Sequence, residues 1–353
     1  MSRAWMEVDL GALVRNASAL CEHAGVPIIP MIKADAYGLG AVEVARALES
    51  LDPLAYGLAT VLEGEELRAA GIIRPILIFT PLLVEEMDAA NAARLTPTLG
   101  SLEEIRAWTC ESPYHLSIDT GMARAGIPWR EVITLRDVIA EKPPEGAFTH
   151  FHSPSLDDGS MDAQLARFRE ALATLPSPPD IIHTDSSAAI VRHGRSPWNA
   201  VRPGIFMYGV GSGRAAALEP ECVVHVKTRI VEVRRVDAGD TVSYDATWEA
   251  PEPRVVATVP MGYADGYPRG ASGRGSVLVN GRTVPILGRV TMDMIMIDVT
   301  DTGAEVGDVV TLIGNSSDGT PISVADVASA ADLSPYELLT GLRGRLTRTY
   351  HGR

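Results

Sequence analysis

A lysine at the end of an apolar segment is the first residue in this sequence that could carry chemistry. Lys33 directly follows the uncharged run Ile28-Ile-Pro-Met-Ile32. An ammonium group in that position must either emerge into solvent or lose its charge, and a desolvated lysine has a lowered pKa that makes it a nucleophile for carbonyl compounds. A solvated lysine at a strand end is the commoner case, so Lys33 needs support from other residues.

Further polar side chains occur where later apolar segments end. They are Asp119, His150, His183, Ser186, Ser187 and Arg202, with Arg124 shortly after Asp119. In a (β/α)₈ barrel the C-terminal strand ends form one rim, and reactive groups gather there. These residues therefore predict a polar, cationic rim around Lys33. Considered singly, Arg124 has the properties of a surface arginine and His150 those of a core histidine.

The elements that would position this rim alternate between strand and helix patterns. A helix capped by Asp9 carries apolar residues at helical spacing from Leu10 to Cys21. The strand candidates are residues 28–33, 55–60, 76–80, 95–99, 115–119, 147–151, 181–183 and 200–202. Eight strands alternating with helices predict a parallel (β/α)₈ barrel. A doubly wound open sheet is the alternative that strand count alone does not exclude.

The pattern changes near residue 218, after which short β segments alternate with turns. Strands are predicted at 224–233, 255–259, 277–279, 294–299 and 309–313, and Asn280-Gly281 is typical of a hairpin turn. Ser334-Pro-Tyr-Glu337 has the form of a capping box and predicts a short closing helix. We expect an α/β fold, with the barrel over residues 1–218 and a mostly β domain over 219–353, which the first strand of the chain could join.

Composition and charge restrict the partners. The chain has 353 residues, of which 46% are apolar and 22% charged, as in ordinary folded proteins. Its formal net charge of -14 repels nucleic-acid phosphates and anionic lipid surfaces, which favours a small-molecule partner. No apolar run approaches the roughly 20 residues of a membrane span, and charges near the N-terminus argue against a signal peptide. Three widely spaced cysteines predict neither disulfides nor a metal site, so the expected compartment is the cytoplasm.

Two longer segments resemble those of one enzyme family. Residues 31–40, Met-Ile-Lys-Ala-Asp-Ala-Tyr-Gly-Leu-Gly, are similar to the segment in which alanine racemases bind pyridoxal 5′-phosphate to a lysine. Residues 259–269, Val-Pro-Met-Gly-Tyr-Ala-Asp-Gly-Tyr-Pro-Arg, are similar to the segment that supplies the second catalytic base of these enzymes. Shorter matches occur in the family's order at 119–124, 149–151, 202–205, 288–293 and 348–350. The resemblance therefore covers the whole chain.

The resemblance implies a cofactor site and two catalytic bases. Pyridoxal 5′-phosphate would form a Schiff base with Lys33, and its pyridine nitrogen would face Arg202. Hydroxyl and main-chain N–H groups suit a dianion. The implied phosphate-binding residues are Tyr37, Ser187, Gly204, Ile205 and Tyr350. Lys33 would exchange the Cα proton on the D side and Tyr263 on the L side, with His150 linking Tyr263 to Arg202 by hydrogen bonds.

The resemblance also implies a substrate and an assembly. The substrate carboxylate would contact Arg124 and the main-chain N–H of Met292, with Asp293 beside them. In this family the tyrosine of the second domain reaches the barrel of the other subunit, so a homodimer with two composite sites is implied. The implied activity is the interconversion of L-alanine and D-alanine, which supplies D-alanine for peptidoglycan.

The sequence departs from the family pattern at three positions. Ser117 stands where many members have a lysine, often carbamylated, that orients the carboxylate-binding arginine. Ser186 replaces the asparagine of an Asn-Ser pair, and Ser155 replaces an acidic residue of the entrance region. These changes leave serine or a broader range of small amino acids open as substrates. An amino-acid decarboxylase and a non-catalytic carrier of pyridoxal phosphate also stay open as functions, although the second domain with its 259–269 segment argues against both.

Overall fold

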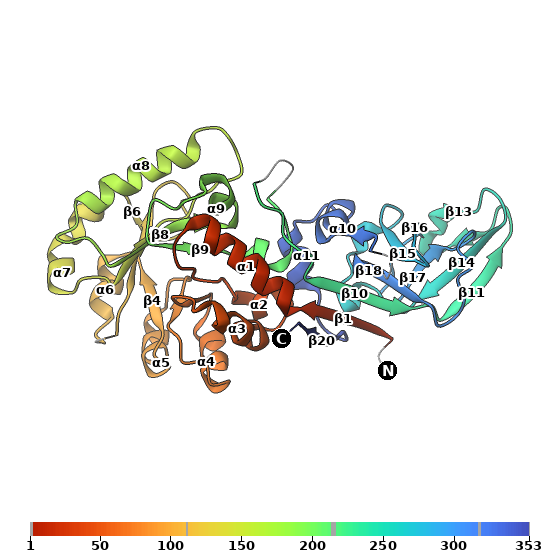
Figure 1. Ribbon diagram of the computed structural model, residues 1–353, viewed down its shortest axis with the longest axis horizontal. Helices are drawn as coiled ribbons and strands as arrows, with labels where there is room; N and C mark the ends of the chain where they lie inside the picture. The colour runs from red at the N-terminus through yellow and green to blue at the C-terminus, as the bar shows by residue number, and fades with distance from the viewer. Residues whose placement is uncertain (1–2, 111, 213–216, 317–318, 353) are drawn as a thin grey trace.

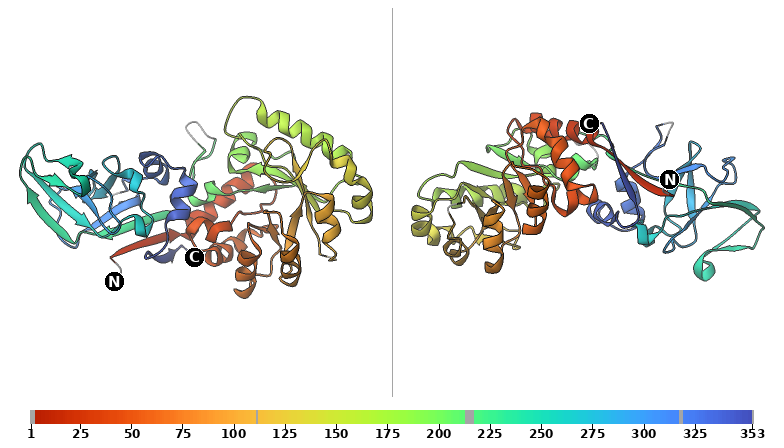
Figure 2. Two further views of the ribbon diagram at one scale, coloured as in Figure 1. Left: turned by 180° about the vertical axis from the view of Figure 1, so that it is seen from behind. Right: turned by 90° about the horizontal axis from the view of Figure 1, so that it is seen from below.

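The computed structural model describes residues 3–110, 112–212, 217–316 and 319–352. The molecule is elongated, with a lobe of strands covered by helices at one end and a lobe built mainly of strands at the other (Figure 1). The helices α1 (Leu10–Ala24) and α11 (Pro335–Gly341) lie at the junction of the two lobes, and the views from behind and below show the same division (Figure 2). Within the described ranges, no helix is long and apolar enough to cross a membrane.

The first lobe contains a parallel sheet that curves into a barrel. Its strands follow one another in the order β2, β3, β4, β5, β7, β8 and β9, and a short strand β6 pairs with β5. The bounds are β2 Tyr56–Leu58, β3 Ile76–Ile78, β4 Thr96–Leu99, β5 His115–Asp119, β6 Ile127–Pro128, β7 Gly146–Phe148, β8 Ile181–Ser186 and β9 Ala200–Arg202. The helices are α2 Lys33–Gly38, α3 Ala41–Leu48, α4 Val61–Ala69, α5 Met87–Ala92, α6 Leu102–Ala107, α7 Arg136–Glu141, α8 Ser160–Ala173 and α9 Ser187–His193. This alternation confirms the predicted α/β barrel.

The segment 28–32 closes the barrel without forming a continuous strand. Ile28 forms a parallel bridge to β9, and Met31 forms a parallel bridge to β2. Pro30 lies between them and has no N–H to donate, which interrupts a regular ladder. Lys33 already begins α2. The predicted strand over 28–33 is therefore corrected to two isolated bridges, although the segment occupies the place of the first barrel strand.

The second lobe is built on a mostly antiparallel sheet. Its strands follow the order β11, β14, β17, β16, β15, β18, β10, β1 and β20, and β19 pairs with β18. The bounds are β1 Ala4–Asp9, β10 Val224–Arg229, β11 Glu232–Val236, β14 Arg254–Val259, β15 Ser276–Val279, β16 Arg282–Leu287, β17 Ile295–Asp298, β18 Val309–Asn315, β19 Pro321–Ile322 and β20 Thr347–His351, with a separate pair β12 Thr241–Val242 and β13 Trp248–Glu249 and the helix α10 Val324–Ala330. Because β1 pairs with β10 and β20, the first strand of the chain lies in this second sheet.

Local signals in the sequence are realised at the helix caps and at the hairpin. The Asp9 carboxylate accepts the N–H of Ala12 at 2.8 Å at the start of α1, and the Ser334 hydroxyl accepts the N–H of Glu337 at 3.3 Å at the start of α11. The turn at 280–281 joins β15 to β16 as predicted. The single strand predicted over 224–233 is wrong. It divides into β10 and β11 because the chain changes its pairing partner from β18 to β14.

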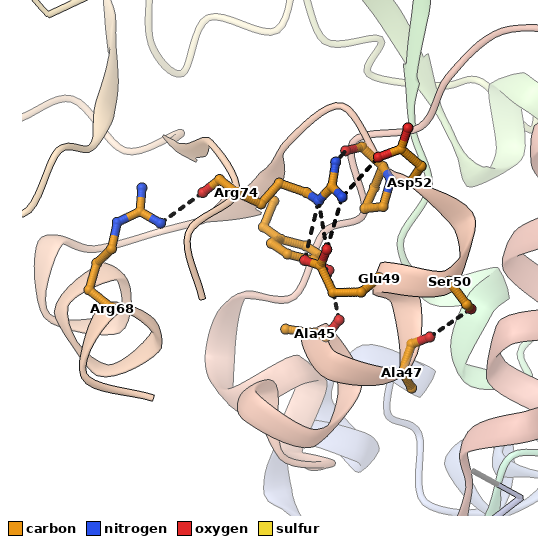
Figure 3. Close-up of polar contacts among 9 residues, drawn as sticks. Ala45, Ala47, Glu49, Ser50, Asp52, Arg68 and Arg74 are labelled. Atoms are coloured by element: carbon orange, nitrogen blue, oxygen red, sulfur yellow. Dashed lines mark hydrogen bonds and ion pairs between the residues drawn. The ribbon is translucent and has the colours of Figure 1, made fainter. Parts of the chain in front are cut away.

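An ion-pair cluster ties residues 49–52, which directly follow α3, to the N-terminal end of the barrel (Figure 3). The Arg74 guanidinium lies between the carboxylates of Glu49 and Asp52, and its Nη2 is 2.9 Å from each. The hydroxyl of Tyr56, the first residue of β2, donates to Glu49 at 2.9 Å. The Arg74 side chain is only 20% exposed, so solvent screens this network less than an ordinary surface ion pair. The Tyr56 hydroxyl also donates to the carbonyl of Ala45 in α3 at 2.7 Å. The cluster therefore fixes the C-terminal end of α3 and the turn after it to the starts of two neighbouring barrel strands.

Candidate active site

A cavity of about 670 Å³ lies at the C-terminal ends of the barrel strands. This volume is typical of a small-molecule site. Among the residues singled out from the sequence, the cavity is lined by Lys33, Tyr37, Ser117, Asp119, Arg124, His150, Ser155, Ser186, Ser187, Arg202, Gly204 and Ile205. They come from α2 and from the ends of β5, β7, β8 and β9, so the barrel brings together side chains that lie far apart in the sequence.

Lys33 is presented by a left-handed helical turn. The residues 34–37 that follow it all have φ between 52° and 57°, in the region that favours glycine, although none of them is glycine. Side chains make this conformation costly, by roughly 1–2 kcal/mol for each residue. Tertiary contacts must therefore stabilise the turn.

Two acidic side chains supply such contacts. Glu63 in the first turn of α4 accepts the N–H of Ala34 at 2.7 Å with one carboxylate oxygen and the N–H of Ala59 at 2.8 Å with the other. Asp35 lies within the turn and accepts an N–H of Arg348 from β20 at 2.6 Å. The turn after Lys33 is thus fastened both to the barrel and to the last strand of the second lobe.

The surroundings of Lys33 favour its neutral form. Burial lowers the pKa of Lys33, and the positive charges of Arg124 and Arg202 lower it further, while Glu63 acts in the opposite direction. A lower pKa increases the fraction of free amine at neutral pH, and the free amine is the form that attacks a carbonyl carbon.

Arg202 is a buried cation at the floor of the cavity. It is 3% exposed at the end of β9. Its Nη1 lies 2.7 Å from Nδ1 of His183, and its Nη2 lies 3.3 Å from Nδ1 of His150. Three main-chain carbonyl oxygens also accept hydrogen bonds from this guanidinium. Burial lowers the pKa of Arg202 to about 10, which leaves the side chain protonated at neutral pH.

His150 takes its tautomer from Arg202. Nη2 also donates to the carbonyl oxygens of Thr149 and Thr184, so its contact with Nδ1 of His150 is a longer, shared one. Because a guanidinium can only donate, this contact favours Nδ1 as the acceptor and the ring proton on Nε2. Burial, followed by the charges of Arg202, Arg124 and Lys33, lowers the pKa of His150 to about 3. The imidazole is therefore neutral at ordinary pH, with an Nε2–H group available to a partner in the cavity.

Tyr37, Ser187 and Gly204, which line the same cavity, form a cradle suited to an anion. The Ser187 hydroxyl accepts the N–H of Gly204 at 2.8 Å. A Cβ at Gly204 would lie 2.8 Å from the Tyr37 hydroxyl, so glycine keeps this space open. Tyr336 of α11 completes the cradle, with its ring centroid 5.9 Å from that of Tyr37. Hydroxyl and main-chain N–H groups beside a lysine amine and a buried cation fit the phosphate, aldehyde and pyridine ring of pyridoxal phosphate.

Asp119 shapes the loop that carries Arg124. Its carboxylate accepts the main-chain N–H groups of residues 121, 122 and 123 at 2.8–3.1 Å. Arg124 itself is exposed and lines the cavity. Ser117 on β5 lines the same cavity and is 7% exposed. Because its hydroxyl is short and uncharged, it offers Arg124 no ionic partner.

Three of the predicted site residues lie together on the second lobe, outside the described lining of the cavity. Tyr263 is 43% exposed, and its N–H donates to the carbonyl of Thr291 at 3.1 Å, beside Met292, which is 52% exposed. Asp293 forms an ion pair of 2.8 Å with Arg345. Tyr263, Met292 and Asp293 therefore form one exposed cluster, which a single chain does not bring to its own cavity.

The structure places Tyr336 at the cradle and Tyr350 elsewhere. Tyr350 lies in β20 with its hydroxyl directed at Gly40, and it is outside the described cavity lining. From the sequence, Tyr336 was predicted only as part of a capping box, and Glu63 was not predicted at all. The pair Thr60 and Glu63 forms a capping box, which was the available signal for Glu63. No local pattern distinguishes the cavity side of α11.

Comparisons with known proteins agree over the whole chain. The model of the N-terminal domain of alanine racemase matches residues 8–212, and that of the C-terminal domain matches residues 223–350. The alanine racemase of Deinococcus radiodurans is 37% identical, covering 99% of both chains, and that of Geobacter sulfurreducens is 37% identical, covering 98% of this chain and 96% of the relative. The crystal structure of alanine racemase from Bartonella henselae with covalently bound pyridoxal phosphate has a TM-score of 0.92 at 28% identity, covering 99% of this chain and 100% of that chain. Alanine racemase from Bacillus anthracis with bound L-Ala-P has a TM-score of 0.91 at 32% identity, covering 100% of this chain and 96% of that chain.

Proposed function

Because the chain belongs to the alanine racemase family, we propose that it interconverts L-alanine and D-alanine with pyridoxal phosphate bound through Lys33. The observation that carries this proposal is the convergence of Lys33, Arg202 and the cradle at Ser187 and Gly204 on one cavity. The amine, the fixed cation and the cradle match the three parts of this cofactor. Tyr37, Ile205 and Tyr336 contribute to the phosphate side of the same cavity.

Arg202 sets the electronic character of the site. When bound, pyridoxal phosphate withdraws electrons from the substrate Cα and so acidifies the Cα–H bond. Arg202 would hold the pyridine nitrogen of the cofactor. As a donor-only group it would leave that nitrogen unprotonated, which would limit how much negative charge the ring takes up. Racemisation needs only the removal and return of one proton, so a restrained electron sink suits it.

Two residues hold the proton on opposite faces of the substrate. The Lys33 amine exchanges it on the D side, and the Tyr263 hydroxyl exchanges it on the L side. Arg202 contacts His150 at 3.3 Å. In the assembled site the Nε2–H group of His150 would donate to the oxygen of Tyr263 from a second copy of the chain, and the charge of Arg202 behind His150 would favour the phenolate. Arg124 binds the substrate carboxylate from the loop beside Asp119.

The working site is composite and needs two copies of the chain. The exposed cluster of Tyr263, Met292 and Asp293 lies on the second lobe, outside the cavity of the same chain. A second copy supplies this cluster to the cavity, and the exchange is reciprocal in a homodimer. We place the enzyme in the cytoplasm as a source of D-alanine for peptidoglycan. A reducing compartment fits the three cysteines, all of which the structure describes as unpaired.

The test combines chirality measurements with a mixing experiment. The protein is purified with pyridoxal phosphate, and the optical rotation of L-alanine and of L-serine is followed. We expect L-alanine to lose rotation without being consumed, and Lys33→Ala and Tyr263→Phe to abolish this. Tyr244→Phe is the control, because Tyr244 lies on the same lobe and is 70% exposed.

Mixing the two inactive variants tests the composite site. After dissociation and reassociation, a heterodimer of Lys33→Ala and Tyr263→Phe contains one intact site, so activity should return. A mixture that stays inactive while its subunits exchange contradicts the composite site. Racemisation of L-serine but not of L-alanine would change the assigned substrate to serine. Release of carbon dioxide would indicate a decarboxylase. A cofactor-loaded protein that is inert toward all amino acids would refute the assignment as a racemase.

A further inference from the structure

Two fully buried histidines continue the hydrogen-bond network of Arg202 into the barrel. His183 and His115 both have 0% exposure. Nδ1 of His183 lies 2.7 Å from Nη1 of Arg202, and Nε2 of His183 lies 2.8 Å from Nδ1 of His115. Nε2 of His115 lies 3.6 Å from a carboxylate oxygen of Glu145, whose side chain is 41% exposed. The chain of groups therefore connects the cavity with the surface near the start of β7.

The barrel interior leaves room for this connection. His115 begins β5 and His183 lies in β8, with β7 between them. A Cβ at Gly146 would clash with the His115 ring, so glycine at this position lets the ring reach across β7. The Phe148 ring stacks on His183 with an interplanar angle of 1° and a centroid distance of 5.2 Å. Both imidazoles are thus fixed by packing as well as by hydrogen bonds.

Arg202 dictates the proton position on each ring in turn. It can only donate, so Nδ1 of His183 accepts and the His183 proton resides on Nε2. That N–H donates to Nδ1 of His115, which places the His115 proton on Nε2, facing Glu145. Burial lowers the pKa of both histidines, so the rings are neutral, as this arrangement requires. At 3.6 Å the contact with Glu145 is electrostatic and longer than a direct hydrogen bond.

We propose that His115 is a positioning residue of the racemase, which accepts the Nε2–H of His183 and thereby fixes the His183 ring that holds Nη1 of Arg202. The carboxylate of Glu145 lies at the outer end of the same relay, 3.6 Å from Nε2 of His115. The inference rests on the proposed function, because it takes Arg202 to be the group that faces the cofactor nitrogen. Without an acceptor at residue 115, the His183 N–H would be buried and unsatisfied, and the ring could turn away from Arg202.

Nitrogen NMR of the histidine side chains tests the relay directly. Protein labelled with ¹⁵N-histidine, free of cofactor and again loaded with pyridoxal phosphate, reports which ring nitrogen carries the proton. In both forms we expect His183 and His115 to carry it on Nε2. A proton on Nδ1 of His183 in the wild-type protein overturns the proposal, whatever the protein catalyses, and this readout is therefore independent of racemase activity.

Two substitutions separate hydrogen bonding from packing. His115→Leu fills similar space without an acceptor, and His115→Asn places a carbonyl oxygen close to the position of Nδ1. We expect His115→Leu to lower kcat for L-alanine roughly tenfold with little change in KM, the effect of one lost hydrogen bond at the cofactor side of the site. We expect the ¹⁵N chemical shifts of His183 to change in His115→Leu and to match those of the wild type in His115→Asn. The asparagine variant should also keep kcat within about threefold of the wild-type value.

The outcomes separate this inference from the proposed function. Equal kcat and unchanged His183 signals in His115→Leu overturn the positioning role. Equal losses in the leucine and asparagine variants also overturn it, because they indicate packing alone. If His115→Leu does not fold, the wild-type tautomers and the rescue by asparagine decide the question. If the wild-type protein racemises nothing, the proposed function fails while the NMR result still decides the relay.

Discussion

Replacing Glu63 with glutamine removes the carboxylate that fastens the left-handed turn after Lys33. One oxygen of Glu63 accepts the N–H of Ala34 at 2.7 Å, and the other accepts the N–H groups of Ala59 at 2.8 Å and Thr60 at 3.2 Å. Glutamine has a single carbonyl oxygen, so it can serve only one of these two sides. Its NH₂ group then points at a main-chain N–H on the other side, and two donors face each other.

The magnitude follows from the hydrogen bonds that are lost. A hydrogen bond to a charged group contributes about 1.5–3 kcal/mol, and the lower end applies here because these contacts are partly exposed. A loss of about 1.4 kcal/mol changes an equilibrium roughly tenfold. The left-handed turn, already costly for its side chains, should therefore open about ten times more often in Glu63→Gln.

Hydrogen exchange followed by mass spectrometry measures that opening. Peptides covering residues 31–40 should exchange roughly tenfold faster in Glu63→Gln, and the variant should react more slowly with pyridoxal phosphate at Lys33. Glu65→Gln is the control, since it makes the same change of charge on the exposed side of α4. If the exchange rate of residues 31–40 is the same in both variants, the turn is stable without the Glu63 carboxylate, and this prediction is refuted.

Two further predictions concern the pH dependence of stability and the closing helix. The pKa of His150 is lowered from 6.5 to about 3 in the folded protein, so between these values the unfolded chain binds a proton that the folded chain does not. The free energy of unfolding should therefore fall as the pH drops below about 6.5. Urea unfolding measures how steeply it falls with pH, and His150→Gln should reduce that slope by up to about 1.4 kcal/mol per pH unit. Equal slopes in the wild type and the variant would contradict the burial of a neutral ring. Ser334→Ala removes the cap of α11 and should cost about 1 kcal/mol, like Ser323→Ala at α10. Only Ser334→Ala should weaken pyridoxal phosphate binding in a fluorescence titration, because α11 carries Tyr336 into the cavity. Equal binding by both variants would contradict a role of Tyr336 in binding the phosphate.

Much of the fold could be predicted because its signals are local. The helix cap at Asp9, the capping box at Ser334 and the hairpin at 280–281 depend on residues within one or two turns of each other, and all three occur in the structure. The alternation of strand and helix patterns predicted the barrel for the same reason. Pro30 shows the limit of pattern reading, because an apolar run around it looks like a strand while its missing N–H reduces the strand to two bridges.

The sequence by itself determined which residue types could do chemistry, and only the tertiary structure decided which of them meet. Lys33, Arg202 and Ser187 were identified from motifs, and the barrel then brought them to one cavity. Tyr336 could not be chosen over Tyr350, because the choice depends on how α11 packs beside the barrel. The contact of Nδ1 of His115 with Nε2 of His183 joins residues 68 positions apart. Such contacts depend on strand order and packing across the sheet, and no pattern within a short stretch of chain encodes them.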